Sequence, residues 1–211
     1  MIMDIKNCIR MYKYGYSNKI NLICSIAFFA LSIFFLMVGS DGAIIGSIYY
    51  TLSVCMLVQV MYNSMFVGFI ASSPLRGKME IRYIDIINWG VGLPGAIIYM
   101  VICLLFGNCE DSYMEIQLVS CGLMAMVMFP YLSFAFKYFI PAIVYMIVGM
   151  NLILGIPESF GMKWEPVLKG NIGLAIILYI AGNVLGILLA HVLRRILYRR
   201  NYSKFAIKME S

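Results

Sequence analysis

Six long apolar runs separated by short loops constrain this chain more than any other feature of its sequence. A run of about 18 or more apolar residues is typical of a membrane span, and such runs fill most of the 211 residues. The chain is 63% hydrophobic and 12% charged, whereas soluble domains are about 45–50% apolar and about 25% charged. The sequence therefore predicts an all-α integral membrane protein whose core is a helix bundle surrounded by lipid.

The predicted elements form a single transmembrane domain over residues 1–211. An amphipathic helix (3–18) is expected first, and a basic tail (194–211) last. The segment Ser72–Arg82 is expected to be a polar loop. The first span follows a polar stretch and lacks a small-residue cleavage site, so it is interpreted as a retained span and not as a signal peptide. The predicted spans are 20–38, 43–71, 83–106, 116–130, 139–156 and 171–193.

The distribution of basic residues predicts the orientation. Lysines and arginines concentrate in the loops and tails of one side, and only Lys163 and Lys169 fall on the other. Cytoplasmic loops carry such an excess, so both termini are expected in the cytoplasm. The net charge of +6 is then explained by topology, and no nucleic-acid partner is expected.

The N-terminal stretch has two chemically different faces. Ile5, Ile9, Tyr12 and Tyr16 share one face at helical spacing, whereas the opposite face carries the cations Lys6, Arg10 and Lys13. A helix of this kind lies in the membrane interface, with its cations toward anionic headgroups. An ordinary basic flank is the alternative.

The predicted loop between the second and third spans carries charge suited to a soluble partner. It reads SSPLRGKMEIR, in which Pro74 and Gly77 break the preceding helix. A solvated turn with topogenic charge is the competing interpretation. Gly77-Lys78 is not a phosphate-binding loop, because Met79 stands where Ser or Thr is needed. No nucleotide site is therefore expected in this chain.

Several polar side chains fall inside the predicted spans, where they are costly and favour a functional hypothesis. Asp85 lies about one turn into the third span, and pairing with Arg82 or Lys78 is favoured over proton coupling. The other candidates are Gln59, Asn63, Asn88 and Asn183.

Two motifs concern helix geometry. Gly92, Pro94 and Gly95 interrupt the third span, and a proline there kinks a helix, so they are a possible hinge. Gly182, Gly186 and Ala190 form a small-residue stripe that permits close helix packing, within the chain in preference to a dimer seam.

Catalytic and metal-binding patterns do not occur. His191 is the only histidine, and the cysteines lack metal-ligand spacing. No hydrolase or protease motif is present, so the chain is not expected to be an enzyme or to hold a metal or cofactor. Arg194, Arg195, Arg199 and Arg200 are interpreted as contacts to anionic lipid.

The turn Ser72–Lys78, together with the segment from Phe129 to Lys137, resembles the permease subunit of a type-2 ABC transporter, in particular the compact six-span exporter permeases of bacteria. The resemblance implies an interfacial connecting helix over Ile5–Tyr16 and a short outer element over Pro157–Lys169. It implies a bacterial cell membrane, a second permease copy, and a separate ATPase that supplies ATP and Mg²⁺. The implied ATPase-coupling residues are Ser73, Pro74, Leu75, Arg76, Lys78, Met79 and Glu80.

The resemblance implies export of a peptide, lipid-like or drug-like molecule, since the spans offer few fixed charges to hold a small ion. Two other functions fit a small six-span protein. One is the substrate-binding subunit of an energy-coupling-factor vitamin importer, and the other is a non-transporting membrane assembly or anchor protein.

Overall fold

The described part of the chain is helical and contains no strand. The computed structural model describes residues 2–14, 18–38, 42–66, 75–106, 113–135, 137–159 and 170–198. Its longer helices are α1 (Ile2–Tyr14), α2 (Asn18–Val38), α3 (Gly42–Phe66), α8 (Tyr113–Ala135), α9 (Phe139–Ser159) and α11 (Ile172–Leu197). The third apolar segment is a composite helix of α5 (Leu75–Gly77), η1 (Lys78–Tyr83), α6 (Ile84–Ile87), η2 (Asn88–Gly92) and α7 (Leu93–Phe106).

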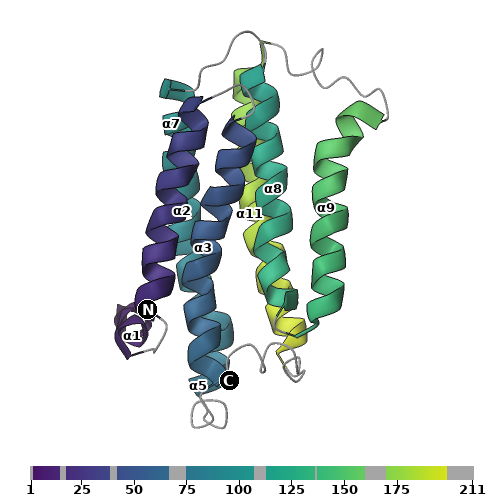
Figure 1. The fold of residues 1–211 in the computed structure, drawn as a ribbon. Helices are drawn as coiled ribbons and strands as arrows, with labels where there is room; N and C mark the ends of the chain where they lie inside the picture. Colours follow the sequence, from purple (N-terminus) through teal and green to yellow (C-terminus); the bar gives the residue numbers. More distant parts are fainter. Residues whose placement is uncertain are drawn as a thin grey trace.

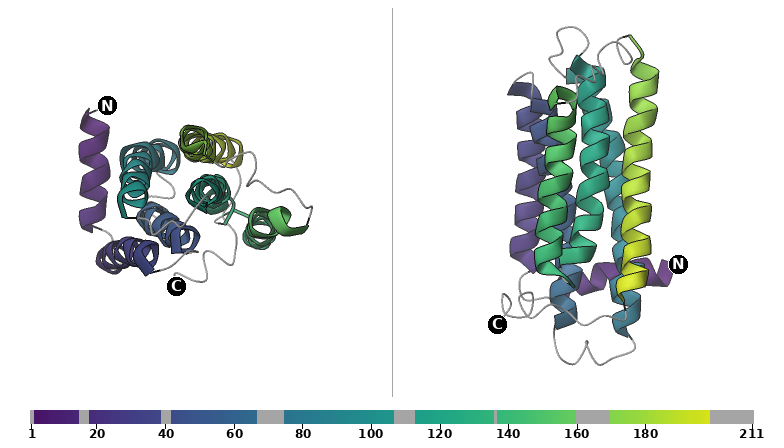
Figure 2. Two further views of the ribbon diagram at one scale, coloured as in Figure 1. Left: turned by 90° about the horizontal axis from the view of Figure 1, so that it is seen from above. Right: turned by 90° about the vertical axis from the view of Figure 1, so that its right-hand side faces the viewer.

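The helices form an upright bundle with α1 lying across one end (Figure 1, Figure 2). The α5 segment and the C-terminal end of α11 lie at the same end as α1. In the centre, α8 packs extensively on α11 and also contacts α3, while α2 packs on α3. Helix α9 stands at the edge and packs chiefly on α8 (Figure 2). The bundle is thus arranged around α8, and α1 lies across one end of it.

Apolar helices and an apolar outer surface make this a membrane-embedded protein. Within the described residues, three helices are long and apolar enough to cross a membrane, over Ile45–Asn63, Lys78–Leu105 and Ile172–Leu197. Shorter apolar stretches lie in the other helices, over Lys19–Phe35, Leu118–Tyr131 and Ile140–Leu152. Large apolar side chains such as Ile26, Ile140 and Ile177 point outward and are more than half exposed, as expected where lipid replaces water as the outer solvent.

Small residues set the distance between α8 and α11. A Cβ added at Gly182 would lie 2.5 Å from the carbonyl oxygen of Gly122, and one added at Gly186 would lie 2.8 Å from that of Ala125. Ala190, the third member of the predicted stripe, is fully buried. Small side chains allow backbones in a membrane to approach this closely. The stripe therefore faces α8 of the same chain.

The composite helix keeps one face buried by alternating α- and π-helical segments. Its buried face returns every fourth residue, at Glu80, Ile84, Asn88, Gly92 and Ala96. An α-helix has about 3.6 residues per turn, so a strict four-residue spacing would drift around its surface. The i→i+5 bonding of the π segments η1 and η2 places more residues in each turn and corrects this drift.

The prediction of a loop over Ser72–Arg82 is wrong from Leu75 onward, where the chain is helical. Helix α11 also continues past Arg194 to Leu197, into the predicted basic tail. In the sequence, charged residues mark the limits of both predicted spans. The helices continue because several of these charges have partners inside the bundle, as described below. The fourth and fifth helices are also longer than predicted, and α8 runs through Pro130 without ending.

Candidate functional site

The end of the bundle near α1 is built around residues 78–87, which comprise η1 and α6 and which we call the hub segment. Glu80, Arg82 and Asp85 of the hub segment each form an ion pair with a different element. Their partners lie at the α8–α9 junction, on α1 and on α11. The hub segment thus links parts of the chain that are far apart in sequence.

The Glu80 pair is the most deeply buried. Glu80 Oε1 lies 2.8 Å from Lys137 Nζ, and both side chains are only 1% exposed. Arg76 Nε lies 3.7 Å from the other carboxylate oxygen of Glu80. Burial lowers the pKa of Lys137, and the hydrogen bond and charge of Glu80 oppose this change. Removing one partner of such a pair is expensive, because it leaves a buried charge without compensation.

The Asp85 carboxylate joins two residues of α11. Its Oδ1 accepts a hydrogen bond from Arg194 Nη2, and its Oδ2 lies 2.6 Å from His191 Nδ1. The Arg194 side chain is 2% exposed and its Nη1 also donates to Ser133 Oγ of α8 at 3.4 Å. Charge-assisted bonds of this kind are stronger than neutral ones. The cluster therefore ties the composite helix, α8 and α11 together.

This arrangement corrects two sequence-based interpretations. Asp85 does not pair with Arg82 or Lys78, because its side chain faces α11 and Arg82 pairs elsewhere. Arg194 does not contact lipid, because it is buried against Asp85 and Ser133. The reason in both cases is that α11 packs against the composite helix and α8, which brings Asp85 and Arg194 together although they are far apart in sequence.

The third connection reaches the interfacial helix. Arg82 Nη2 lies 3.2 Å from Asp4 Oδ2 of α1. One turn further along α1, Cys8 is buried and its Sγ donates a weak hydrogen bond to the Tyr83 carbonyl oxygen at 4.0 Å. On the other side of α1, Ile9 is 65% exposed and Lys6 and Arg10 are exposed. Helix α1 thus docks on the hub segment by one face and presents apolar and cationic groups on another.

The predicted ATPase-coupling residues fall at this end of the bundle. Lys78 is exposed and Arg76 is half-buried, whereas Met79 and Glu80 are buried. Leu75 begins the composite helix, and Ser73 and Pro74 lie outside the described residues. The described part of the segment therefore has an exposed basic side and a side anchored in the bundle.

The predicted intramembrane amides lie on α3, the composite helix and α11. Asn88 and Asn183 are buried, and among the described residues the side-chain oxygen of each has no hydrogen-bond partner. Asn183 Nδ2 donates to the Tyr179 carbonyl oxygen at 3.0 Å. Gln59 and Asn63 are half-buried on α3. These side chains place polar groups in the bundle on three different helices.

The possible hinge is held by tyrosines from two other helices. Tyr50 Oη of α3 donates to the Gly92 carbonyl oxygen, and Tyr179 Oη of α11 donates to the Ala96 carbonyl oxygen at 2.9 Å. Pro94 is the second residue of α7, which begins directly after the π segment η2. A Cβ added at Gly95 would lie 3.0 Å from Tyr50 Oη. The segment is therefore closely packed in this conformation, and hinge motion stays a prediction.

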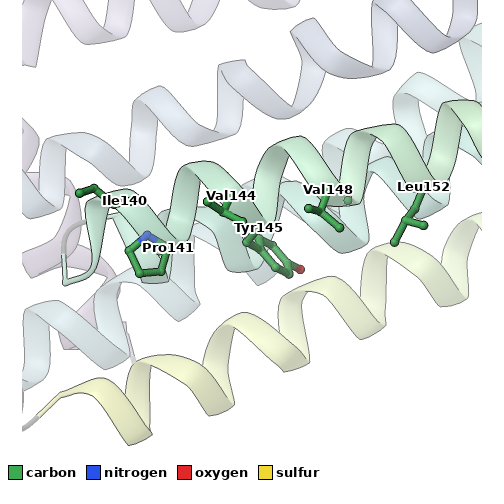
Figure 3. A pocket seen from close by; sticks show the side chains of 7 residues that line it. Ile140, Pro141, Val144, Tyr145, Val148 and Leu152 are labelled. Atoms are coloured by element: carbon green, nitrogen blue, oxygen red, sulfur yellow. The ribbon is translucent and has the colours of Figure 1, made fainter.

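An apolar groove of about 500 Å³ runs along α9 between Ile140 and Leu152 (Figure 3). Figure 3 shows its lining side chains along one side of that helix. Tyr145 contributes the polar side-chain group of the groove lining. Its hydroxyl donates to the Met126 carbonyl oxygen at 3.5 Å. The groove suits lipid chains or other apolar groups better than a charged ligand.

Within the described residues, no group of three or more His, Cys, Asp and Glu side chains could hold a metal ion. Comparisons with protein-family models, curated proteins and solved structures find no match to this chain. The candidate site is therefore defined by its geometry alone.

Four members of the site were not assigned to it from the sequence: Asp4, Lys137, His191 and Arg194. One signal could have identified Arg194, because it continues the four-residue spacing of Gly182, Gly186 and Ala190 and so shares the face that packs on α8. No comparable pattern marks Lys137, which lies at a junction between helices.

Proposed function

We propose that this chain is the transmembrane permease subunit of an ATP-driven ABC exporter, acting with a separate ATPase and a second permease copy in a bacterial cell membrane. The observation that carries the proposal is the segment 75–80. It combines an exposed Lys78 with a Glu80 that is buried against Lys137. A segment of this kind can contact a soluble partner on one side and pass force into the bundle on the other.

The helix lengths support six spans. Helices α2 and α9 have 21 residues each and α8 has 23, which at about 1.5 Å per residue gives about 31–35 Å. The hydrocarbon core of a bilayer is about 30 Å thick. Since these helices run beside the three longer ones (Figure 1), we propose that all six cross the membrane.

The charge distribution supports a cytoplasmic location for the end of the bundle that contains the hub segment. Lys6, Lys19, Lys78 and Arg195 are exposed near this end, and cytoplasmic flanks are enriched in such residues. Helix α1, with exposed Ile9 and Arg10, would then lie on the inner leaflet and contact anionic lipid.

The transported molecule is proposed to be a peptide, a lipid-like compound or a drug-like compound. The apolar groove on α9 suits such cargo, since its lining carries no charge. A second permease copy is part of the proposal because one chain of this size has too few spans to enclose a large path. ATP and Mg²⁺ would bind to the ATPase subunit.

Co-purification tests this function. The chain is isolated from its native membrane in mild detergent, and bound proteins are identified by mass spectrometry. Lys78→Glu is compared with Lys19→Glu, which reverses an exposed charge at the same end on α2. Arg76 is left unchanged because it contacts Glu80.

An ATPase that is recovered with the wild type and with Lys19→Glu, and lost with Lys78→Glu, is the expected result. Failure to recover any ATPase with the wild type would refute the proposed function. The vitamin-importer and anchor hypotheses would then be tested by small-molecule binding.

A further inference from the structure

We infer that Glu80, Arg82 and Asp85 are positioning residues through which the hub segment sets the places of the α8–α9 junction, α1 and α11, each through its own ion pair. The mechanical part of this inference concerns the bundle itself. Its link to ATP-driven motion rests on the proposed function.

The three side chains of the hub segment point in different directions. In the hub segment, Glu80 reaches Lys137, Arg82 reaches Asp4, and Asp85 reaches Arg194 and His191. Three residues within six positions of the chain thus contact three elements that are far apart in the sequence. The π segment η1 contributes, since it turns Glu80 toward the bundle on the same face as Ile84.

Two of these connections are buried. Glu80 and Lys137 are 1% exposed, and Arg194 is 2% exposed. Neither element can move away from the hub segment without leaving a charge in an apolar surrounding, which is strongly unfavourable. These two connections therefore favour one discrete arrangement.

The connection to α1 contrasts with these two. The Arg82 side chain is 58% exposed, so its pair with Asp4 is screened by solvent. Helix α1 is consequently held less tightly than the α8–α9 junction or α11. Displacement of α5, which precedes the hub segment directly, would then be passed to the two buried connections first.

Distance measurements by electron paramagnetic resonance test this inference on the full chain in lipid nanodiscs. Spin labels replace Lys78 on the hub segment and, in separate samples, Tyr138, Ile196 or Ile9, all of which are exposed. The background lacks the six native cysteines and must keep the wild-type melting temperature. Three neutralising variants are compared: Glu80→Gln, Asp85→Asn and Arg82→Gln.

Each variant is expected to change one distance more than the other two. Glu80→Gln should shift and broaden the 78–138 distribution most, Asp85→Asn the 78–196 distribution, and Arg82→Gln the 9–78 distribution. The exchange Glu80→Lys with Lys137→Glu should restore the 78–138 distribution, whereas Glu80→Lys alone should not.

Two outcomes would overturn the inference. If one variant changes all three distances equally, the charges merely stabilise the whole bundle. If no variant changes any distance, the connections do not set position.

These results are independent of the ATPase. Should an ATPase be recovered, the label at Lys78 is moved to the exposed Trp89, so that the proposed ATPase contact stays intact. ATP is then expected to change both the 89–138 and the 89–196 distances in the wild type, and to leave the 89–196 distance unchanged in Asp85→Asn. If none is recovered, the proposed function fails and the distance pattern still decides the inference.

Discussion

Asp85 and Arg194, which are 109 positions apart in the chain, form a charge-assisted hydrogen bond between the composite helix and α11. The arginine is almost wholly buried, and Ser133 of α8 accepts its second bond. The two charges meet because Gly182, Gly186 and Ala190 let α11 lie close to its neighbours. The small-residue stripe of α11 and the Asp85–Arg194 hydrogen bond therefore depend on one another.

The Asp85–Arg194 pair is expected to contribute strongly to stability. Asp85→Asn leaves a buried arginine without its counter-charge, so we expect the free energy of unfolding to fall by about 3–5 kcal/mol. Unfolding in mixed micelles with increasing denaturing detergent measures this change. Arg82→Gln is the matched control, since it removes an exposed pair and should cost less than about 1 kcal/mol. Equal effects of the two variants would contradict the assignment.

The Glu80–Lys137 pair should show strong coupling in a double-mutant cycle. Glu80→Gln leaves the buried Lys137 without its charge partner and is expected to cost about 3–5 kcal/mol. Lys137→Met leaves Glu80 with only the more distant Arg76 and should cost less. The double variant should be less destabilised than the sum of the single variants, since it leaves neither charge unpaired. Additive effects, measured by the same unfolding assay, would mean that the two side chains do not interact.

Close packing between α8 and α11 predicts a large difference between two glycines of α11. A methyl group at Gly182 would lie 2.5 Å from the Gly122 carbonyl oxygen, whereas one at Gly173 would meet nothing within 4 Å. We expect Gly182→Ala to destabilise the protein by about 1–3 kcal/mol through overpacking. Gly173→Ala should leave the melting temperature unchanged or raise it slightly. If Gly182→Ala left the free energy of unfolding unchanged, α8 and α11 would have to be further apart than in this structure.

The burial of Cys8 predicts slow and pH-dependent alkylation. Burial raises the pKa of this thiol from 9.0 to about 11, which lowers the thiolate fraction near pH 8 by about 100-fold. Iodoacetamide labelling, followed by mass spectrometry of the Cys8 peptide, compares native protein with protein unfolded in detergent. Arg82→Gln should accelerate labelling, because it weakens the docking of α1.

The sign of the pH effect on α1 follows from the same shift. The folded pKa of Cys8 lies above the unfolded value, so the docked state binds more protons between the two. The contribution of Cys8 to docking is complete below about pH 9 and is lost as pH rises through about 11. Labelling of native protein that stays independent of pH across this window would contradict burial of the thiol.

The sequence by itself determined the helical, membrane-embedded character of the protein. It also showed which stretches are apolar, because the length and apolarity of a segment are local properties that lipid selects directly. It gave the existence of the amphipathic helix α1 and the small-residue stripe on α11 for the same reason: both are patterns within one helix. Helix ends were less predictable, because Glu80 and Arg194 are charged and are accommodated in the bundle only by partners from distant elements.

Only the tertiary structure decided which charges meet. Lys137, His191 and Arg194 carry no local mark that assigns them to Glu80 or Asp85, because an ion pair between distant elements depends on how closely and at what rotation the helices pack. The π segments that keep Glu80, Ile84 and Asn88 on one face were likewise seen only in the structure. Local features such as apolar runs and helix faces could therefore be predicted from the sequence. The ion pairs of the hub segment could not, because they form only when folding brings together charges that would be unfavourable in the bundle alone.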